Sequence, residues 1–278
     1  MNRFDNKTHT QTLYWLTRVL TLLMMNTYSM NSDAANTYDL PLAVSAVVIQ
    51  IKPHNSTSFT QGWVKEGDFF YESSGLYGHS FIQYHRASDP FTIMSTAKLP
   101  AHYFAEGLTL LNHQIYLLTW KSEVMLILNK ETLAIENSLP YKGEGWGLTH
   151  NGSQLIMSNG SSQLLFRDPN DFSIKRRITV KQPLQLNELE YVDGIIWAND
   201  WNKDSIYGIN SKNGCIIVTL DLSAIRRQAV TPNRSNIPNG IAYDRQAHGL
   251  WITGKYWPAR YLIDYPSINL EILNHSSC

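Results

Sequence analysis

The sequence is short of the features that several functional classes require. Its 278 residues include two cysteines, Cys215 and Cys278, which can make one bridge at most and cannot build a disulfide framework or a four-cysteine zinc site. Lysine plus arginine total 23 and aspartate plus glutamate total 23, so the chain lacks the surplus of cations with which duplex-binding proteins displace counterions from phosphate. No apolar run approaches the roughly 20 residues of a membrane-spanning helix. We therefore expect no nucleic-acid partner and no membrane span.

Familiar catalytic signatures are also missing. The nine histidines and two cysteines do not cluster at metal-ligand spacing, and there is no Gly-x-Ser-x-Gly elbow, phosphate loop or dinucleotide fingerprint. The sequence thus predicts neither a catalytic metal nor a cofactor, and it gives little support to nucleophilic or redox chemistry. What remains is a carboxylate that moves a proton while a lysine and side-chain amides stabilise charge.

The first 35 residues differ from the rest of the chain. Arg3 and Lys7 precede a short apolar stretch over residues 13–25, and small residues around Ala34 follow a polar segment. This pattern resembles a secretory signal peptide, although Arg18 interrupts the apolar stretch. We therefore expect residues 1–35 to be a signal peptide and the protein to be secreted or periplasmic; the alternative is a short amphipathic or disordered leader.

The chain does contain aromatic residues in quantity, and it contains a repeat. Aromatic side chains make up 12% of the residues and can bury a sizeable core. A short signature recurs five times with register points spaced by 45, 40, 44 and 49 residues, at Gly62, Gly107, Gly147, Tyr191 and Gly240. Two turn sequences follow each signature, the first at 66–68, 112–113, 151–152, 193–194 and 248–249, the second at 88–90, 129–130, 168–170, 213–214 and 265–266. Two turns per repeat indicate about four strands per repeat.

Five four-stranded repeats predict an all-β fold, a five-bladed β-propeller closed into a ring. We expect one domain over residues 41–278, in which the strongly β-forming residues 43–51 pair with the last blade and close the ring. A β-sandwich is the alternative fold, but it does not explain a signature that recurs at this period.

The propeller topology predicts which side chains meet on one face. The first strand of a blade begins where the antiparallel second strand ends, so both positions lie on the same rim. Starts of first strands contribute Phe59, Gln61, Phe104, Glu106, Trp146, Asn187, Glu188, Glu190 and Asn239; ends of second strands contribute Glu72, Trp120, Asn159, Trp201, Lys255 and Trp257. Aromatic walls with a few polar groups predict a pocket for a small, partly polar ligand. For single residues the alternatives are structural: a tryptophan can pack between blades, and a carboxylate such as Glu190 can accept backbone N–H groups.

Several segments carry a family resemblance in the right order over about residues 45–265. They read FTQG at 59–62, GLYG at 75–78, FAEGLT at 104–109, GEGWGLT at 143–149, LNELEYV at 186–192, NGIAYD at 239–244 and TGKYWP at 253–258. They are similar to the glutaminyl-peptide cyclotransferases of the plant and bacterial type. The resemblance implies a five-bladed propeller that converts the N-terminal glutamine of peptides or proteins into pyroglutamate and releases ammonia, without a catalytic metal. We expect such an enzyme to act as a monomer.

The resemblance also implies roles for single residues. Glu106 would be the general acid and base, while Lys255, Asn187 and Gln61 would bind and polarise the substrate. The walls of the pocket would be Phe59, Phe104, Trp120, Trp146 and Trp201. Two other functions stay open at this point: a propeller lactonase or hydrolase, which would hold a divalent ion with Glu106, Asn187 and Asn239, and a non-catalytic propeller that binds peptides or sugars.

Overall fold

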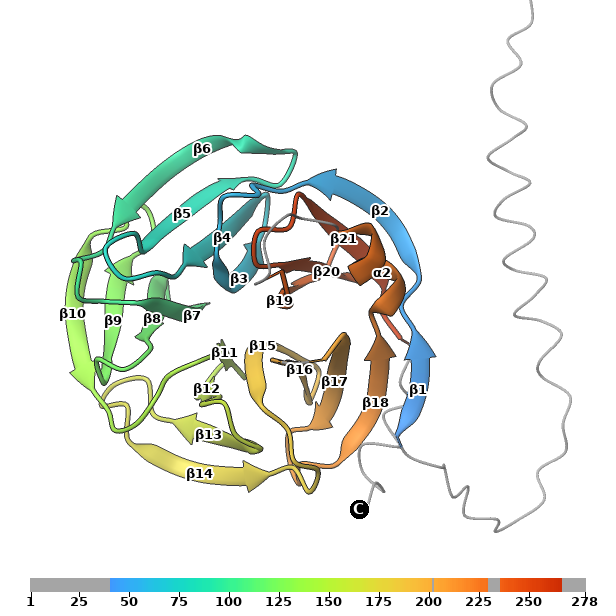
Figure 1. Cartoon of the computed structure of the whole chain (residues 1–278). Helices are drawn as coiled ribbons and strands as arrows, with labels where there is room; N and C mark the ends of the chain where they lie inside the picture. The colour runs from blue at the N-terminus through green and yellow to red at the C-terminus, as the bar shows by residue number, and fades with distance from the viewer. Residues whose placement is uncertain (1–40, 202, 230–235, 267–278) are drawn as a thin grey trace, which may run out of the picture. The chain divides into compact units, whose positions relative to one another are not determined.

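The computed structural model describes residues 41–201, 203–229 and 236–266, and the regular structure in this part of the chain is almost entirely β-strand. The strands form five sheets that follow one another around a central axis (Figure 1). The predicted five-bladed β-propeller is therefore confirmed. The leader expected at residues 1–35 lies outside the described residues.

The first three blades are each built from four consecutive strands in meander order. Blade 1 contains β3 (Thr60–Glu66), β4 (Phe69–Ser74), β5 (Phe81–Arg86) and β6 (Asp89–Lys98). Blade 2 contains β7 (Ala105–Leu111), β8 (Gln114–Thr119), β9 (Val124–Asn129) and β10 (Ile135–Pro140). Blade 3 contains β11 (Leu148–His150), β12 (Leu155–Met157), β13 (Gln163–Arg167) and β14 (Ile174–Thr179).

The last two blades recruit strands from the beginning of the described chain. Blade 4 contains β15 (Leu186–Val192), β16 (Ile195–Asp200), β17 (Ser205–Asn210) and β18 (Ile216–Asp221), with β1 (Leu42–Ser45) added at its outer edge. Blade 5 contains β19 (Pro238–Asp244), β20 (Gly249–Gly254), β21 (Ala259–Asp264) and β2 (Val48–Pro53). The short helix α2 (Ser223–Gln228) follows β18, and its Ile225 packs into the apolar cluster between blades 4 and 5.

The ring is closed by β2, which pairs in antiparallel fashion with β21, as predicted. The prediction of a single strand over residues 43–51 was wrong, however. The segment divides into two strands, and β1 instead pairs in parallel with β18 of blade 4, with Leu42 opposite Val218. Because β2 occupies the outer position of blade 5, this sheet takes its fourth strand from the beginning of the described chain; the turn predicted at 265–266 lies at the end of the described residues.

Local backbone chemistry accounts for the hairpins. The predicted first turn of each repeat joins the innermost strand of a blade to its second strand. These turns contain residues with positive φ, including Asn112 at 51°, Asp193 at 48° and Gly194 at 91°. Asparagine, aspartate and glycine adopt this conformation at the lowest cost, which explains why the turn residues could be read from the sequence.

The core is divided among the interfaces between neighbouring blades. Five apolar clusters are present in the described residues, one at each of the five interfaces of the ring. Innermost strands can contribute to the clusters on both sides, as β7 does, and β7 is buried along its whole length. This burial on both faces explains why the inner strands are runs of apolar residues without strict alternation.

Glycines let the innermost strands approach one another at the central channel. A Cβ on Gly107 would lie 2.5 Å from the backbone nitrogen of Leu148, and a Cβ on Gly147 would lie 2.0 Å from the carbonyl oxygen of Asn187. These contacts correct the register of the fourth repeat: its position equivalent to Gly147 is Glu188 rather than Tyr191. The fourth blade therefore carries a carboxylate where its neighbours carry glycine.

Candidate active site

The candidate site is built at one height of the channel by irregularities in the inner strands. The pairing of β3, β7, β15 and β19 with their second strands shifts register near the start of each strand, between Thr60 and Gly62 in β3 for example. Such bulges re-aim side chains. The residues in the four irregular stretches are Gln61, Glu106, Asn187 and Asn239, each followed by glycine or by Glu188. The repeat therefore places one polar side chain from each of four blades at the same level.

Glu106 is the buried carboxylate of this level. Its residue is only 6% exposed, and its nearest polar contact is a long one, with Gln61 Nε2 at 3.5 Å from Oε1. Burial raises the pKa of Glu106 well above its usual range, the positive charge of Lys255 opposes this shift, and the negative charge of Glu144 adds to it. Because so few donors stabilise the carboxylate, it retains the basicity that a proton acceptor needs.

Lys255 is the second buried charge of the site. It follows β20 in a turn that is held at the backbone, where Lys255 N–H donates to the Ile237 carbonyl (3.0 Å) and Tyr256 N–H donates to the Ser58 carbonyl (2.8 Å). Its Nζ lies 4.5 Å from the centre of the Phe59 ring. Burial lowers the pKa of Lys255 to about 8, against the opposing effect of Glu106. The ion pairs formed within the described chain do not include Lys255 with Glu106, so the two charges interact without direct contact.

Side-chain amides line the same level. Asn239 Nδ2 donates to the Gln61 Oε1 at 3.2 Å and to the Thr60 carbonyl at 2.9 Å, which turns the nitrogen of Gln61 toward Glu106. Asn187 is buried, and its Oδ1 has no hydrogen-bond partner among the described residues. A buried amide oxygen without a donor is costly, so this atom is poised to accept a hydrogen bond from a ligand.

Aromatic rings surround the polar level in two groups. Phe104 contacts Phe59 at 6.2 Å and Trp120 at 5.5 Å between ring centres. Trp146 meets Trp201 edge to face at 5.9 Å, and Trp201 remains 38% exposed. The nine residues predicted for the site lie within two residues of the start of an innermost strand or directly after the end of a second strand, and their role in binding or catalysis stays a prediction.

The structure adds three residues to which the sequence analysis assigned no role. Tyr77 lies 5.4 Å from Phe104 and Tyr256 lies 5.3 Å from Phe59, measured between ring centres. Glu144 accepts hydrogen bonds from the indoles of Trp120 and Trp146. Tyr77, Glu144 and Tyr256 all fall inside segments that carry the family resemblance, so that resemblance was the one signal that pointed to them.

Four residues that the sequence analysis expected on the rim instead have structural contacts elsewhere in the propeller. Trp257 is fully buried in the cluster between blades 4 and 5. Glu72 lies inside blade 1, where it accepts hydrogen bonds from Thr60 (2.7 Å) and Gln83 (2.9 Å) and pairs with His54 (3.1 Å). Glu188 accepts backbone hydrogen bonds from two other blades, as the structural alternative allows.

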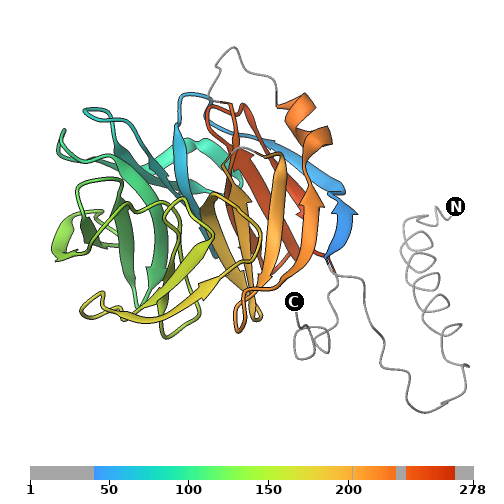
Figure 2. The same cartoon turned by 60° about the horizontal axis from the view of Figure 1, so that its bottom comes forward.

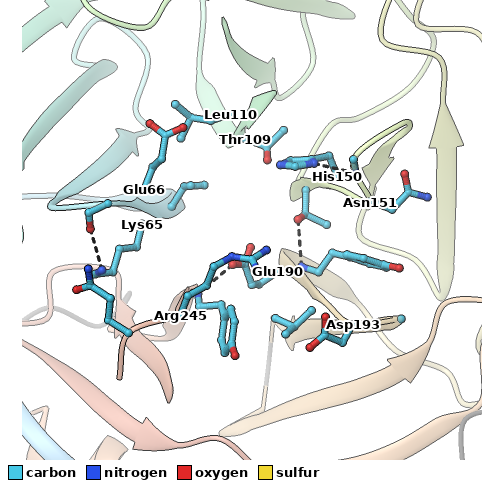
Figure 3. A pocket seen from close by; sticks show the side chains of 18 residues that line it. Lys65, Glu66, Thr109, Leu110, His150, Asn151, Glu190, Asp193 and Arg245 are labelled. Carbon is cyan, nitrogen blue, oxygen red and sulfur yellow. Dashed lines mark hydrogen bonds between the residues drawn. The ribbon is translucent and has the colours of Figure 1, made fainter. Parts of the chain in front are cut away.

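Glu190, the fourth, lies at the opposite mouth of the channel. It accepts the backbone N–H of Tyr243 at 2.9 Å, which confirms the structural alternative for this residue. It lines a cavity of about 720 Å³ to which all five blades contribute residues, Lys65, His150 and Arg245 among them (Figure 3). Figure 2 shows the ring from another side, with strands that cross its thickness. Glu106 lies at the start of β7, whereas Thr109 and Leu110, further along the same strand, line the cavity. Burial raises the pKa of Glu190 to about 7.

In residues 41–201, 203–229 and 236–266, no group of three or more histidine, cysteine, aspartate or glutamate side chains is arranged to hold a metal ion. The one helix in this part of the chain, α2, is too short to cross a membrane.

The fold and the rim define a five-bladed propeller whose channel mouth holds a buried carboxylate, a buried lysine and an aromatic cage. Residues 19–265 match the family model described as glutamine cyclotransferase. A glutaminyl-peptide cyclotransferase from Arabidopsis thaliana is 32% identical over 253 residues, covering 87% of this chain and 78% of the relative. The crystal structure of Myxococcus xanthus glutaminyl cyclase matches with a TM-score of 0.75 at 29% identity, covering 82% of this chain and 100% of that chain. This chain belongs to the glutamine cyclotransferase family.

Proposed function

We propose that this protein is a glutaminyl-peptide cyclotransferase in which Glu106 is the proton shuttle. It converts the N-terminal glutamine of a peptide or protein into pyroglutamate and releases ammonia. Family membership supports the reaction. The observation that supports the role of Glu106 is its environment, because a buried carboxylate with one weak donor and a raised pKa has no structural task in the described chain.

The reaction is an intramolecular aminolysis. The α-amine of free peptides has a pKa of about 7.7–8.0, so a large share is protonated at neutral pH and cannot attack. The unprotonated amine nitrogen forms a bond to the side-chain carboxamide carbon, and Glu106 takes the proton that this nitrogen then has to lose. Glu106 then gives the proton to the carboxamide nitrogen, the C–N bond breaks, and ammonia leaves with pyroglutamate as the product. One carboxylate performs both transfers in sequence.

Lys255, Asn187 and Gln61 stabilise and orient the reacting groups. The Lys255 ammonium lies in a dry environment, where a donor aimed at the developing oxyanion is most effective. The free Oδ1 of Asn187 accepts an N–H of the substrate, which fills its vacant hydrogen bond. Gln61 holds Glu106 in place through its own contact with Asn239.

The aromatic side chains act as a cage. A glutamine side chain must fold back onto its own amine, and confinement between rings lowers the entropic cost of that conformation. Phe59 and Phe104 lie beside the charged pair, while Trp120, Trp146 and Trp201 form the more exposed wall. Their partial exposure leaves an opening through which the rest of the peptide can extend.

We also propose that catalysis needs no metal ion, that the protein is a monomer and that it is exported. A protonated Lys255 close to Glu106 opposes the binding of a divalent cation there and already supplies the positive charge that the oxyanion requires. The ring closes within one chain, which supports a monomer. Export rests on the signal-peptide pattern of residues 1–35.

The test of the proposed function is release of ammonia from a dipeptide that begins with glutamine. The same dipeptide with an acetylated N-terminus is the matched control, because it keeps the carboxamide and removes the attacking amine. We expect ammonia and pyroglutamyl product from the first and neither from the second. Equal ammonia release from both peptides would indicate amide hydrolysis and contradict the proposal.

A further inference from the structure

The carboxylate of Glu144 joins two tryptophans from neighbouring blades. Its Oε2 accepts a hydrogen bond from Trp120 Nε1 at 2.8 Å and another from Trp146 Nε1 at 3.0 Å. Trp120 directly follows β8 of blade 2, whereas Trp146 lies two residues before β11 of blade 3. A single oxygen atom thus joins two rings that otherwise pack against different neighbours, Trp120 against Phe104 and Trp146 against Trp201.

The other oxygen of Glu144 faces a cation. Lys121 Nζ lies 3.5 Å from Oε1 and 4.0 Å from the centre of the Trp120 ring. The side chains of Lys121 and Glu144 are 53% and 40% exposed, so this pair contributes little to the stability of the fold. The Lys121–Glu144 pair is instead placed to order Trp120, because Lys121 covers one face of the Trp120 ring and Glu144 accepts the hydrogen bond of the Trp120 indole N–H.

The backbone around Glu144 is constrained as well. The Gly145 N–H donates to the Trp120 carbonyl at 3.0 Å, and a Cβ on Gly145 would lie 2.2 Å from the hydroxyl oxygen of Tyr141. Gly143 has a φ of 89°, and its N–H donates to Glu123 at 2.9 Å. These contacts present the Glu144 side chain to both indoles before any substrate binds.

We propose that Glu144 is a positioning residue that clamps the indoles of Trp120 and Trp146 into one wall of the substrate cage. The role rests on the proposed function, because it concerns the cage in which glutamine is folded. A preformed wall spares the substrate the cost of ordering two large rings on binding. Its loss therefore weakens binding of the substrate more than it slows the chemistry.

The charge of Glu144 has a second, separable effect. The negative charge of Glu144 contributes to the raised pKa of Glu106, after the larger effect of burial. Glu144 is ionised in this setting: burial opposes its charge, but the hydrogen bonds from Trp146 and Trp120 and the charge of Lys121 hold its pKa low. Removing the charge lowers the pKa of Glu106 and moves the acid side of the activity profile to lower pH.

Two substitutions separate the clamp from the charge. Glu144→Gln keeps an oxygen that can accept both indole N–H groups and removes the charge, whereas Glu144→Ala removes both. Glu136→Gln is the matched control, because it removes an exposed carboxylate of β10 that contacts Gln114 and Asn129 instead of the cage. For the Ala variant we expect KM for a glutamine dipeptide to rise about tenfold with a smaller change in kcat. The Gln variant should recover most of the KM, and both should shift the acid limb of kcat/KM downward while the control does not.

The clamp also has a readout that does not depend on turnover. The indole N–H signals of Trp120 and Trp146, assigned by Trp→Phe variants, should move in the NMR spectrum of the free Ala variant and stay close to wild type in the Gln variant. Unchanged indole signals and unchanged KM in the Ala variant would overturn the clamp, and so would a Gln variant with the same KM defect as Ala. If the parent released no ammonia, the proposed function would fail while the indole signals still tested the clamp.

Discussion

Glu106 and Glu188 make an instructive comparison, because both are buried glutamates at the channel end of innermost strands. Glu188 accepts the backbone N–H of Trp63 at 3.3 Å and that of Ile241 at 2.8 Å, and so ties its own blade 4 to blades 1 and 5. The carboxylate of Glu106 accepts no backbone N–H in the described chain, and its one hydrogen bond there is the long contact with Gln61. Burial raises the pKa of both carboxyls.

The difference separates a structural carboxylate from one available for chemistry. Burial is common to both and therefore does not identify function. The two carboxylates differ in their hydrogen-bond partners. Glu188 accepts two backbone N–H groups that would otherwise be left unpaired. Glu106 instead lies near the charge of Lys255 and the aromatic cage. A buried polar group without a structural partner is the informative observation.

The largest effect is expected from Glu106→Gln. The amide keeps the size of the side chain but cannot accept the substrate proton, so kcat should fall by about 10² to 10⁴-fold. Because no backbone N–H of the described residues pairs with the Glu106 carboxylate, the midpoint of urea unfolding should stay close to wild type. A destabilised variant whose folded fraction turns over normally would show that Glu106, like Glu188, has a structural role and is not the proton shuttle.

The pH dependence of kcat/KM probes the same carboxylate in the parent enzyme. Glu106 works in its ionised form and its pKa is raised, so activity should increase with pH through an inflection above the ordinary glutamate value of about 4.3. Lys255 works as the ammonium, so activity should decline above about pH 8 as it deprotonates. Beyond each limb the loss is about tenfold per pH unit.

A Lys255→Arg variant tests whether Lys255 causes the alkaline limb. Arginine stays charged, so the decline in activity that is due to deprotonation of Lys255 should disappear, while titration of the substrate amine remains. If the acid limb of kcat/KM had its inflection at the ordinary pKa of an exposed glutamate, a group other than the buried Glu106 would be the proton acceptor.

Glu188→Gln should show the reverse pattern to Glu106→Gln. The amide oxygen can accept one backbone N–H, but the NH₂ group then faces the other donor, at a cost of about 1–3 kcal/mol in the free energy of unfolding. Turnover per folded molecule should change little. Glu190→Gln is the matched control, because its oxygen can still accept the Tyr243 N–H beside an open cavity. Equal stability of the two variants would show that Glu188 does not tie the blades together.

The tryptophans extend the comparison from the carboxylates to their surroundings. Trp201→Ala removes a partly exposed ring that meets Trp146, so kcat/KM should fall by about tenfold while the fold survives. Trp197→Ala removes a fully buried ring from the cluster between blades 4 and 5 and should cost about 3–5 kcal/mol of stability. Circular dichroism melts alongside kinetics distinguish the two; a Trp201 variant that unfolds would place that ring among the structural ones.

The smallest effect is expected from chelation. Since we propose that neither Glu106 nor Glu188 binds an essential cation, EDTA at millimolar concentration should leave ammonia release unchanged. Loss of activity that zinc or calcium restores would favour the metal-dependent alternative, with Glu106 as a ligand in place of a base.

Much of the architecture was predictable because it is encoded locally. Turn residues such as Asn112 and Asp193 appear in the sequence as the types that tolerate positive φ, and their spacing implied four strands per repeat. The repeat in turn placed Gln61 and Glu106 at the same level of the channel, whereas its register in the fourth blade was three residues off, and the structure puts Asn187 at this level. The wrong predictions concern features that neighbouring residues do not determine. The β-forming character of residues 43–51 does not indicate that the segment divides between two blades. Nor does the sequence around Glu72 indicate that this carboxylate pairs with His54.

The sequence by itself determined the propeller, its five repeats and the set of residue types available for chemistry, because turns and strand periodicity depend on neighbouring residues. The tertiary structure alone decided which glutamate is free to act. Glu106, Glu188 and Glu190 are the same residue type on equivalent inner strands, and their roles depend on backbone N–H groups, cations and cavities supplied by other blades. Those partners are remote in the chain, since hydrogen bonding and desolvation act through space.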